Sequence, residues 1–256
     1  MNTKNILIAF VLIITATGAF ANRRHFSYVY ESPVLPRGAR EIEIWNTLRT
    51  DKNKFYRGIN HRVEYEMGLG SGFQTSLYLN LSTEASGDPI TWGNELSISN
   101  EWKLNISDPT ADVIGSAIYA EWTLKPDETE LEGKIILDKH FGDFLSAANI
   151  TIEHEIPGHG SEGADIIEAA AALGYVINNN FSFGFEARYH TISEGDVSTS
   201  ALFAGPTFSV SDKTWWATIS IMPQIGLGSN KENTTSNLEL TKHEKVEARV
   251  LLSFEL

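Results

Sequence analysis

Apolar and polar residues alternate with a period of two along most of this chain. Residues 73–81 are a clear case, because most odd positions are apolar while the even positions include Gln74, Ser76 and Asn80. Residues 246–256 repeat the alternation at the end of the chain. Successive side chains of a β-strand point to opposite faces of a sheet, so this pattern predicts strands with one apolar and one polar face.

About twelve segments of this kind follow one another after residue 40, and helical periodicity is nearly absent. Each segment is long enough to cross a bilayer as a tilted strand of ~9–11 residues. The sequence therefore predicts an all-β fold, namely a transmembrane, antiparallel, up-and-down β-barrel of about twelve strands.

The links between these segments differ in length. The links that read as tight hairpin turns are rich in Gly, Asn and Asp and lie at 70–72, 142–143, 178–180 and 212–214. The links after the third, seventh and ninth segments are expected to be longer, and residues 226–245 form the longest. Residues 105–112 are moderately long on the side expected to be short. Short turns on one side and longer loops on the other indicate an outer-membrane barrel with both termini in the periplasm.

The N-terminus has the three parts of a secretory signal peptide. Lys4 supplies a positive charge, residues 6–14 are apolar, and residues 19–21 read Ala-Phe-Ala, a small-x-small cleavage site. The apolar run is too short for a transmembrane helix. The chain is therefore expected to be exported.

These features predict how the chain is divided. We expect residues 1–21 to be a cleaved signal peptide, residues 22–40 a periplasmic N-terminal segment, and residues 41–256 a barrel in the bacterial outer membrane. The N-terminal segment contains Pro33 and Pro36 and is predicted either to enter the periplasmic mouth of the barrel or to be a plain linker. Outer-membrane lipid, the barrel-assembly machinery and small solutes are the expected partners.

The composition excludes other classes of protein. The chain has no cysteine, so it has neither a disulfide framework nor a thiolate metal site. Its formal net charge of -13 is opposite to what nucleic-acid binding requires. We predict no cofactor, no metal site and no catalytic residue.

Charged residues on the polar faces separate a membrane barrel from a soluble one. A soluble β-sandwich or lipocalin-like barrel also alternates, but its strands are shorter and its apolar faces form the core. The polar faces here carry too many charges for a dry interior, whereas a wet or salt-bridged lumen accommodates them. The residues predicted to line this lumen are Glu41, Glu43, Arg62, Glu64, Glu66, Glu95, Glu101, Glu121, Glu130, Glu132, Lys134, Glu153, Glu168, Glu186, Arg188 and Arg249.

The start of the mature chain carries a family resemblance. Residues 25–32 read HFSYVYES and are followed by Leu35-Pro36, Gly38 and residues 41–43. This stretch resembles the mature N-terminus of uncharacterised porin-like bacterial outer-membrane proteins. The resemblance implies a porin-like β-barrel and no assigned catalytic residues. The terminal Leu256 departs from the aromatic residue that usually ends such barrels.

Two functions follow from a charged lumen. An acidic wall attracts cations, which predicts a porin-like passive channel for small cationic or neutral solutes. The same carboxylates can instead pair with Arg and Lys and fill the interior. A closed structural barrel that binds partners through extracellular loops, mainly residues 226–245, is therefore the alternative.

A membrane-embedded hydrolase is a less favoured alternative, and its best candidate is the polar stretch 152–163, IEHEIPGHGSEG. A zinc-protease motif needs His-Glu-x-x-His on a helix, but His154 and His159 are separated by Pro157-Gly158, which breaks a helix. We predict a strand end and an external turn here, with cation binding by His154, His159 and Glu162 as the weaker alternative.

Overall fold

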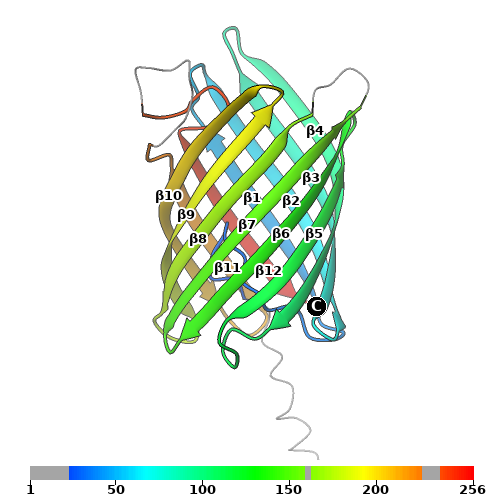
Figure 1. The fold of residues 1–256 in the computed structure, drawn as a ribbon, viewed down its shortest axis with the longest axis vertical. Coiled ribbons are helices and arrows are strands. Elements are labelled where there is room, and N and C mark those ends of the chain that lie inside the picture. The colour runs from blue at the N-terminus through cyan, green and yellow to red at the C-terminus, as the bar shows by residue number, and fades with distance from the viewer. Residues whose placement is uncertain (1–22, 159–162, 227–236) are drawn as a thin grey trace, which may run out of the picture.

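The computed structural model of the protein describes residues 23–158, 163–226 and 237–256. Within these residues, antiparallel strands form a closed barrel in which neighbours in sequence are neighbours in the sheet and β12 pairs with β1 (Figure 1). The strands are β1 (Arg40–Thr50), β2 (Tyr56–Gly70), β3 (Phe73–Ser86), β4 (Thr91–Ser107), β5 (Gly115–Leu124), β6 (Glu128–Phe141), β7 (Phe144–Pro157), β8 (Asp165–Val176), β9 (Phe181–Glu194), β10 (Val197–Ser211), β11 (Trp215–Pro223) and β12 (Val246–Glu255). The predicted all-β barrel is confirmed.

Three parts of the sequence-based predictions fall outside the described residues. They are the signal peptide at 1–21, His159 and Glu162 of the polar stretch, and the middle of the link at 226–245. Among the residues that are described, no helix is long and apolar enough to cross a bilayer.

The alternation sorts side chains between the outside and the inside of the barrel. In β3, Leu77 and Leu79 are 61% and 53% exposed, whereas Tyr78 between them is 3% exposed. The exposed apolar side chains cover the outer surface, where bilayer lipid replaces water. The closing pair of strands runs in register from Glu41 opposite Glu255 to Thr50 opposite Val246, so no strand edge remains unpaired.

The predicted tight turns are confirmed, but two links expected to be long are short. β9 and β10 are joined only by Gly195-Asp196, and β3 and β4 only by residues 87–90. Backbone pairing continues into the polar residues beyond the bilayer-spanning alternation, because ladder hydrogen bonds do not depend on side-chain polarity. Figure 1 shows the β3–β4 hairpin rising above the rim. The predicted lengths of these two links are therefore wrong, and their flanking strands are longer than predicted.

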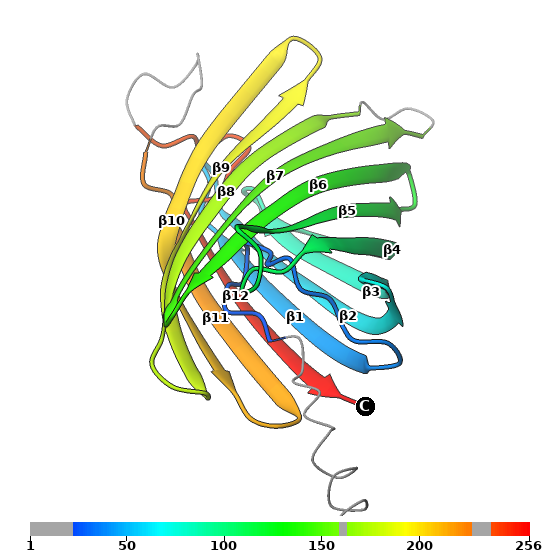
Figure 2. The same cartoon turned by 60° about the horizontal axis from the view of Figure 1, so that its bottom comes forward.

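The C-terminus and the first described residues of the chain lie at one end of the barrel. We call it the periplasmic end, because short turns and termini face the periplasm in outer-membrane barrels. From this end, residues 23–39, here called the plug, enter the lumen (Figure 2). Phe26 and Val29 of the plug are 1% and 0% exposed and pack against Leu145 and Ala147 of β7. The segment is therefore part of the interior and is not a linker.

The link after β11 also turns inward over its described part. Residues 237–245 lie at the opposite, outer end, where Glu239 and His243 are buried. The side-chain amide of Gln224 donates to the carbonyl oxygen of Glu239 at 2.7 Å and accepts from its backbone N–H at 2.6 Å. This described part of the link narrows the outer mouth of the cavity.

Candidate functional site

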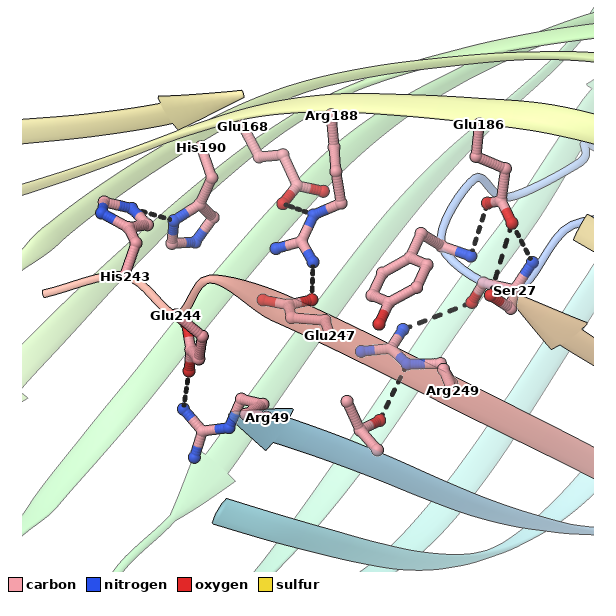
Figure 3. A network of polar contacts seen from close by, with 12 residues as sticks. Ser27, Arg49, Glu168, Glu186, Arg188, His190, His243, Glu244, Glu247 and Arg249 are labelled. Carbon is pink, nitrogen blue, oxygen red and sulfur yellow. Dashed lines mark hydrogen bonds and ion pairs between the residues drawn. The ribbon is translucent and has the colours of Figure 1, made fainter. Parts of the chain in front are cut away.

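Glu186 of β9 holds the plug inside the lumen. Its carboxylate accepts hydrogen bonds from the backbone N–H groups of Ser27, Tyr28 and Val29 at 3.0, 2.7 and 2.9 Å. The hydroxyl groups of Ser27 and Ser220 donate to the same carboxylate, and Figure 3 shows Glu186 beside Ser27. Glu186 is fully buried. Glu186, which was predicted to line the lumen, therefore binds the plug of its own chain.

Side chains of other wall residues bind further backbone groups of the plug, since buried backbone N–H and C=O groups need hydrogen-bond partners. Asn149 accepts from the N–H of Tyr30 at 2.6 Å and donates to its carbonyl oxygen at 3.0 Å. Gln74 accepts from the N–H of Leu35 at 2.8 Å. Lys103 donates to the carbonyl oxygen of Pro33 at 2.8 Å. The plug is thus fixed to several strands around the barrel.

Small wall residues make room for the plug. A Cβ atom added at Gly184 would lie 2.9 Å from the ring of Phe26, and one added at Gly174 would lie 3.0 Å from it. At Gly68 an added Cβ would lie only 2.2 Å from the carbonyl oxygen of Pro36 and 2.4 Å from that of Leu35. The interior faces of β2, β8 and β9 are therefore shaped around this segment.

Replacing Gly68 by valine is expected to detach the returning half of the plug. Overpacking of this kind costs about 1–3 kcal/mol, and backbone atoms cannot move aside as a flexible side chain can. Hydrogen exchange measured by mass spectrometry should show faster exchange in peptides covering residues 33–38. Gly133→Val is the matched control, because an added Cβ there meets nothing within 4 Å. Unchanged exchange in Gly68→Val would contradict this packing.

A cavity of about 550 Å³ lies between the plug and the outer mouth. Tyr28 and Tyr30 of the plug line it from the periplasmic side. Lys242, His243 and Glu244 line it from the outer side. The lining includes nine Glu and seven Arg or Lys side chains, so the cavity is strongly polar with a small acidic excess.

The predicted lumen residues divide between this cavity and the plug. Those lining the cavity are Arg62, Glu95, Glu121, Glu130, Glu132, Lys134, Glu153, Glu168, Arg188 and Arg249. Those outside it and buried are Glu41, Glu43, Glu64, Glu66, Glu101 and Glu186. In this second set, Glu43, Glu64 and Glu66 lie close enough to Arg24 of the plug to act on its charge. Of all the predicted lumen residues, only Glu95 is exposed, and it lies near the outer rim.

Ion pairs take up much of the cavity's acidic charge. Arg188 of β9 contacts Glu168 at 2.8 Å and Glu247 at 2.5 Å (Figure 3). Arg49 of β1 contacts Glu244 at 2.9 Å, and Glu84 at 2.6 Å. Further pairs join Lys134 to Glu132, Arg62 to Glu121, and Lys125 to Glu130. Of the carboxylates lining the cavity, Glu95 and Glu153 have no ion pair within the described parts of the chain.

Further residues line the cavity besides those predicted from the sequence. His190 Nδ1 lies 3.0 Å from His243 Nε2, and His243 Nδ1 lies 2.7 Å from Glu239. Burial alone would raise the pKa of the Glu239 carboxyl, but hydrogen bonds from His243 and Thr241 hold it well below its usual range. Tyr28 of the plug also lines the cavity, and the centre of its ring lies 3.9 Å from the Arg249 guanidinium. Tyr28, Glu239 and His243 belong to segments without strand periodicity, which gave no signal of their position. His190 follows Glu186 and Arg188 at every second position of β9, so alternation could have placed it in the lumen.

Glu31 of the plug lies near the periplasmic end. Its carboxylate accepts from the backbone N–H of His25 at 2.8 Å and contacts His25 Nδ1 at 2.9 Å. Burial alone would raise the pKa of Glu31, but the charge and hydrogen bonds of His25 lower it to about 2. Glu31 is therefore ionised at neutral pH.

The polar stretch that suggested a metalloprotease ends a strand. β7 continues to Pro157, and His154 Nδ1 lies 2.7 Å from the Asp165 carboxylate on the exposed outer face. Glu153 points to the other side and lines the cavity. Glu155 accepts from the N–H of Ala164, which closes the start of the link to β8. The predicted strand end is confirmed in these residues.

A closed barrel with an apolar outside and a charged lumen defines an outer-membrane β-barrel of the porin-like class. The chain belongs to DUF6662, a family of unknown function, which it matches over residues 18–256. Comparison with curated protein sequences found no match.

Solved outer-membrane proteins share this fold. The COG4313 outer-membrane channel from Pseudomonas putida F1 is 10% identical, with 90% of this chain and 100% of that chain covered and a TM-score of 0.67. The NanC porin is 11% identical, with 84% and 100% covered and a TM-score of 0.56. The KdgM porin is 9% identical, with 84% and 99% covered and a TM-score of 0.55. At such low identities these matches show the fold alone, which is that of an outer-membrane β-barrel.

Proposed function

We propose that this protein is a passive, porin-like channel for small cationic or neutral solutes. The cavity of about 550 Å³ supports the proposal, because its lining has nine carboxylates against seven Arg and Lys side chains. Cavities of roughly 300–1,000 Å³ accommodate small organic molecules. An acidic excess favours cations, and among these nine carboxylates Glu95 and Glu153 have no ion pair with any described residue. The resemblance to proteins described as channels and porins agrees with this function.

The plug and residues 237–245 bound the cavity on its two sides, so both limit the passage of solutes. Water and small ions are expected to pass slowly around the plug in the native protein. Removing the plug is expected to leave a wider path, because twelve strands enclose a lumen between those of filled eight-stranded barrels and open 16-stranded porins.

Conductance across planar bilayers tests the proposal. At ~0.1 M salt, where charge is screened over about 10 Å, we expect the native channel to prefer potassium over chloride by at least ~2-fold. Deleting residues 24–36 should raise the conductance several-fold. Replacing Glu95 and Glu153 together by glutamine should reduce the cation preference without changing the fold. Anion preference in the native protein would contradict the proposal.

One observation favours the alternative of a closed structural barrel, namely the many hydrogen bonds between the plug and the wall. The same recordings separate the two functions, because a barrel closed by its plug shows no conductance in the native protein and conducts only after residues 24–36 are deleted. We propose no catalytic activity; turnover of phospholipids or peptides by the purified protein would contradict this.

Interaction with the barrel-assembly machinery is likewise a proposal, which crosslinking during assembly would test.

A further inference from the structure

Two histidines and two carboxylates meet where the plug contacts β6 near the periplasmic end. Glu31 comes from the plug, and Asp138 and His140 come from β6. One possible ligand atom from each of these three residues lies within 4.8 Å of the others. The ring of His25 lies edge-on to that of His140, with 6.3 Å between their centroids. The cluster therefore joins two parts of the chain that are far apart in sequence.

Asp138 and His140 each bury polar atoms that have no hydrogen bond of normal geometry within the described residues. Asp138 is only 3% exposed, and neither of its carboxylate oxygens has a hydrogen bond of normal geometry within the described residues. Ser32 approaches this carboxylate with both its hydroxyl and its backbone N–H, but neither forms a hydrogen bond of normal geometry with it. Nε2 of His140 is also buried and without a hydrogen bond. Unsatisfied buried polar groups are costly, so their convergence indicates a ligand that accepts their lone pairs.

The distances suit a metal ion better than direct contact. His140 Nε2 lies 3.9 Å from Glu31 Oε1, which is too far for a hydrogen bond. Two ligands bound tetrahedrally to zinc at its usual distances are roughly 3.3 Å apart, so a small closing movement would bring both into coordination. Imidazole and carboxylate together favour zinc, whereas calcium and magnesium prefer oxygen ligands alone.

We propose that Glu31, Asp138 and His140 bind a zinc ion that fastens the plug to the barrel wall. Glu31 is held in position by His25, which donates to it as groups around a metal commonly do for a ligating carboxylate. A water molecule completes the four ligands of the ion. Because the ion contacts both the plug and β6, it binds only the docked arrangement tightly. Zinc at 100 times its dissociation constant should therefore favour docking by about 100-fold.

Zinc titration of the untagged, full-length barrel in detergent tests the site. We expect one zinc ion per chain by calorimetry, and a loss of affinity of at least ~10-fold in Asp138→Asn and His140→Ala. His154→Ala is the matched control, since His154 and Asp165 form another His–carboxylate pair 2.7 Å apart, on the exposed surface. Heat-modifiable migration on gels verifies that each variant still forms a barrel.

Hydrogen exchange of residues 26–35 gives a second readout that does not depend on conductance. Zinc should slow exchange in the native chain and in His154→Ala, but not in His140→Ala. The proposal is overturned if zinc does not bind saturably, if Asp138→Asn and His140→Ala bind it as the native chain does, or if His154→Ala abolishes binding. These outcomes leave the channel proposal untouched, because ion passage is measured separately.

Discussion

Replacing Glu186 by alanine is expected to release the plug while the barrel stays closed. The substitution removes the acceptor of three backbone N–H groups, those of Ser27, Tyr28 and Val29. A buried donor left without a partner costs about 1–3 kcal/mol. We therefore expect the substitution to weaken docking of the plug by about 3 kcal/mol in total, which corresponds to a change of roughly 150-fold in the docking equilibrium.

Limited trypsin digestion measures this release. Arg24 is buried in the docked plug, so cleavage after it requires undocking. Cleavage of a transiently opened segment follows the population of the open form, so the rate should rise by about 100-fold in Glu186→Ala. Glu95→Ala is the control, because Glu95 lines the outer rim of the cavity away from the plug. Equal cleavage rates in the native chain and Glu186→Ala would show that Asn149, Gln74 and Lys103 suffice to hold the plug.

The side of the wall on which Glu186 lies was predictable, but its partner was not. Phe185 and Ala187 alternate with it, and a strand that faces lipid on one side must turn the intervening residue inward. The same reasoning placed Arg188 and Glu168 in the lumen. The plug, in contrast, has no periodicity, and its contacts with Glu186 join residues about 160 positions apart. Such contacts depend on the closed barrel, which the local sequence pattern does not describe.

Which charged side chains pair within the lumen could not be predicted from the sequence either. Alternation predicts that Glu168, Arg188 and Glu247 all point inward, but which of them meet depends on how the strands are staggered around the barrel. The glycines that pack against Phe26 are a sequence signal that alternation alone does not reveal. Gly174 and Gly184 interrupt strands at inward positions, and a glycine within a strand often marks a close approach by another segment. Strand ends were the least predictable feature, as Gly195-Asp196 shows.

Replacing Arg188 by methionine is expected to destabilise the barrel by about 3–5 kcal/mol, because it leaves two buried carboxylates without their cation. Arg188 is 8% exposed and contacts Glu168 and Glu247. Its guanidinium also lies 4.7 Å from the ring centre of Tyr28, so the substitution weakens contact with the plug as well. Denaturant unfolding in detergent, followed by tryptophan fluorescence, measures the loss. Arg57→Met is the control, because Arg57 is exposed on β2.

The cause of this loss can be separated from a loss of packing. If uncompensated charge is responsible, adding Glu168→Gln and Glu247→Gln to Arg188→Met should restore most of the stability, since buried ion pairs replaced as a group are often neutral. Lowering the pH toward about 4, near the ordinary pKa of glutamate, should narrow the gap between the native chain and Arg188→Met for the same reason. The Arg188 guanidinium also lies 5.4 Å from the ring centre of Phe203. A loss that persists in the triple variant would mean that the guanidinium stabilises the lumen mainly through its contacts with the rings of Tyr28 and Phe203, and the ion pairs would then contribute little.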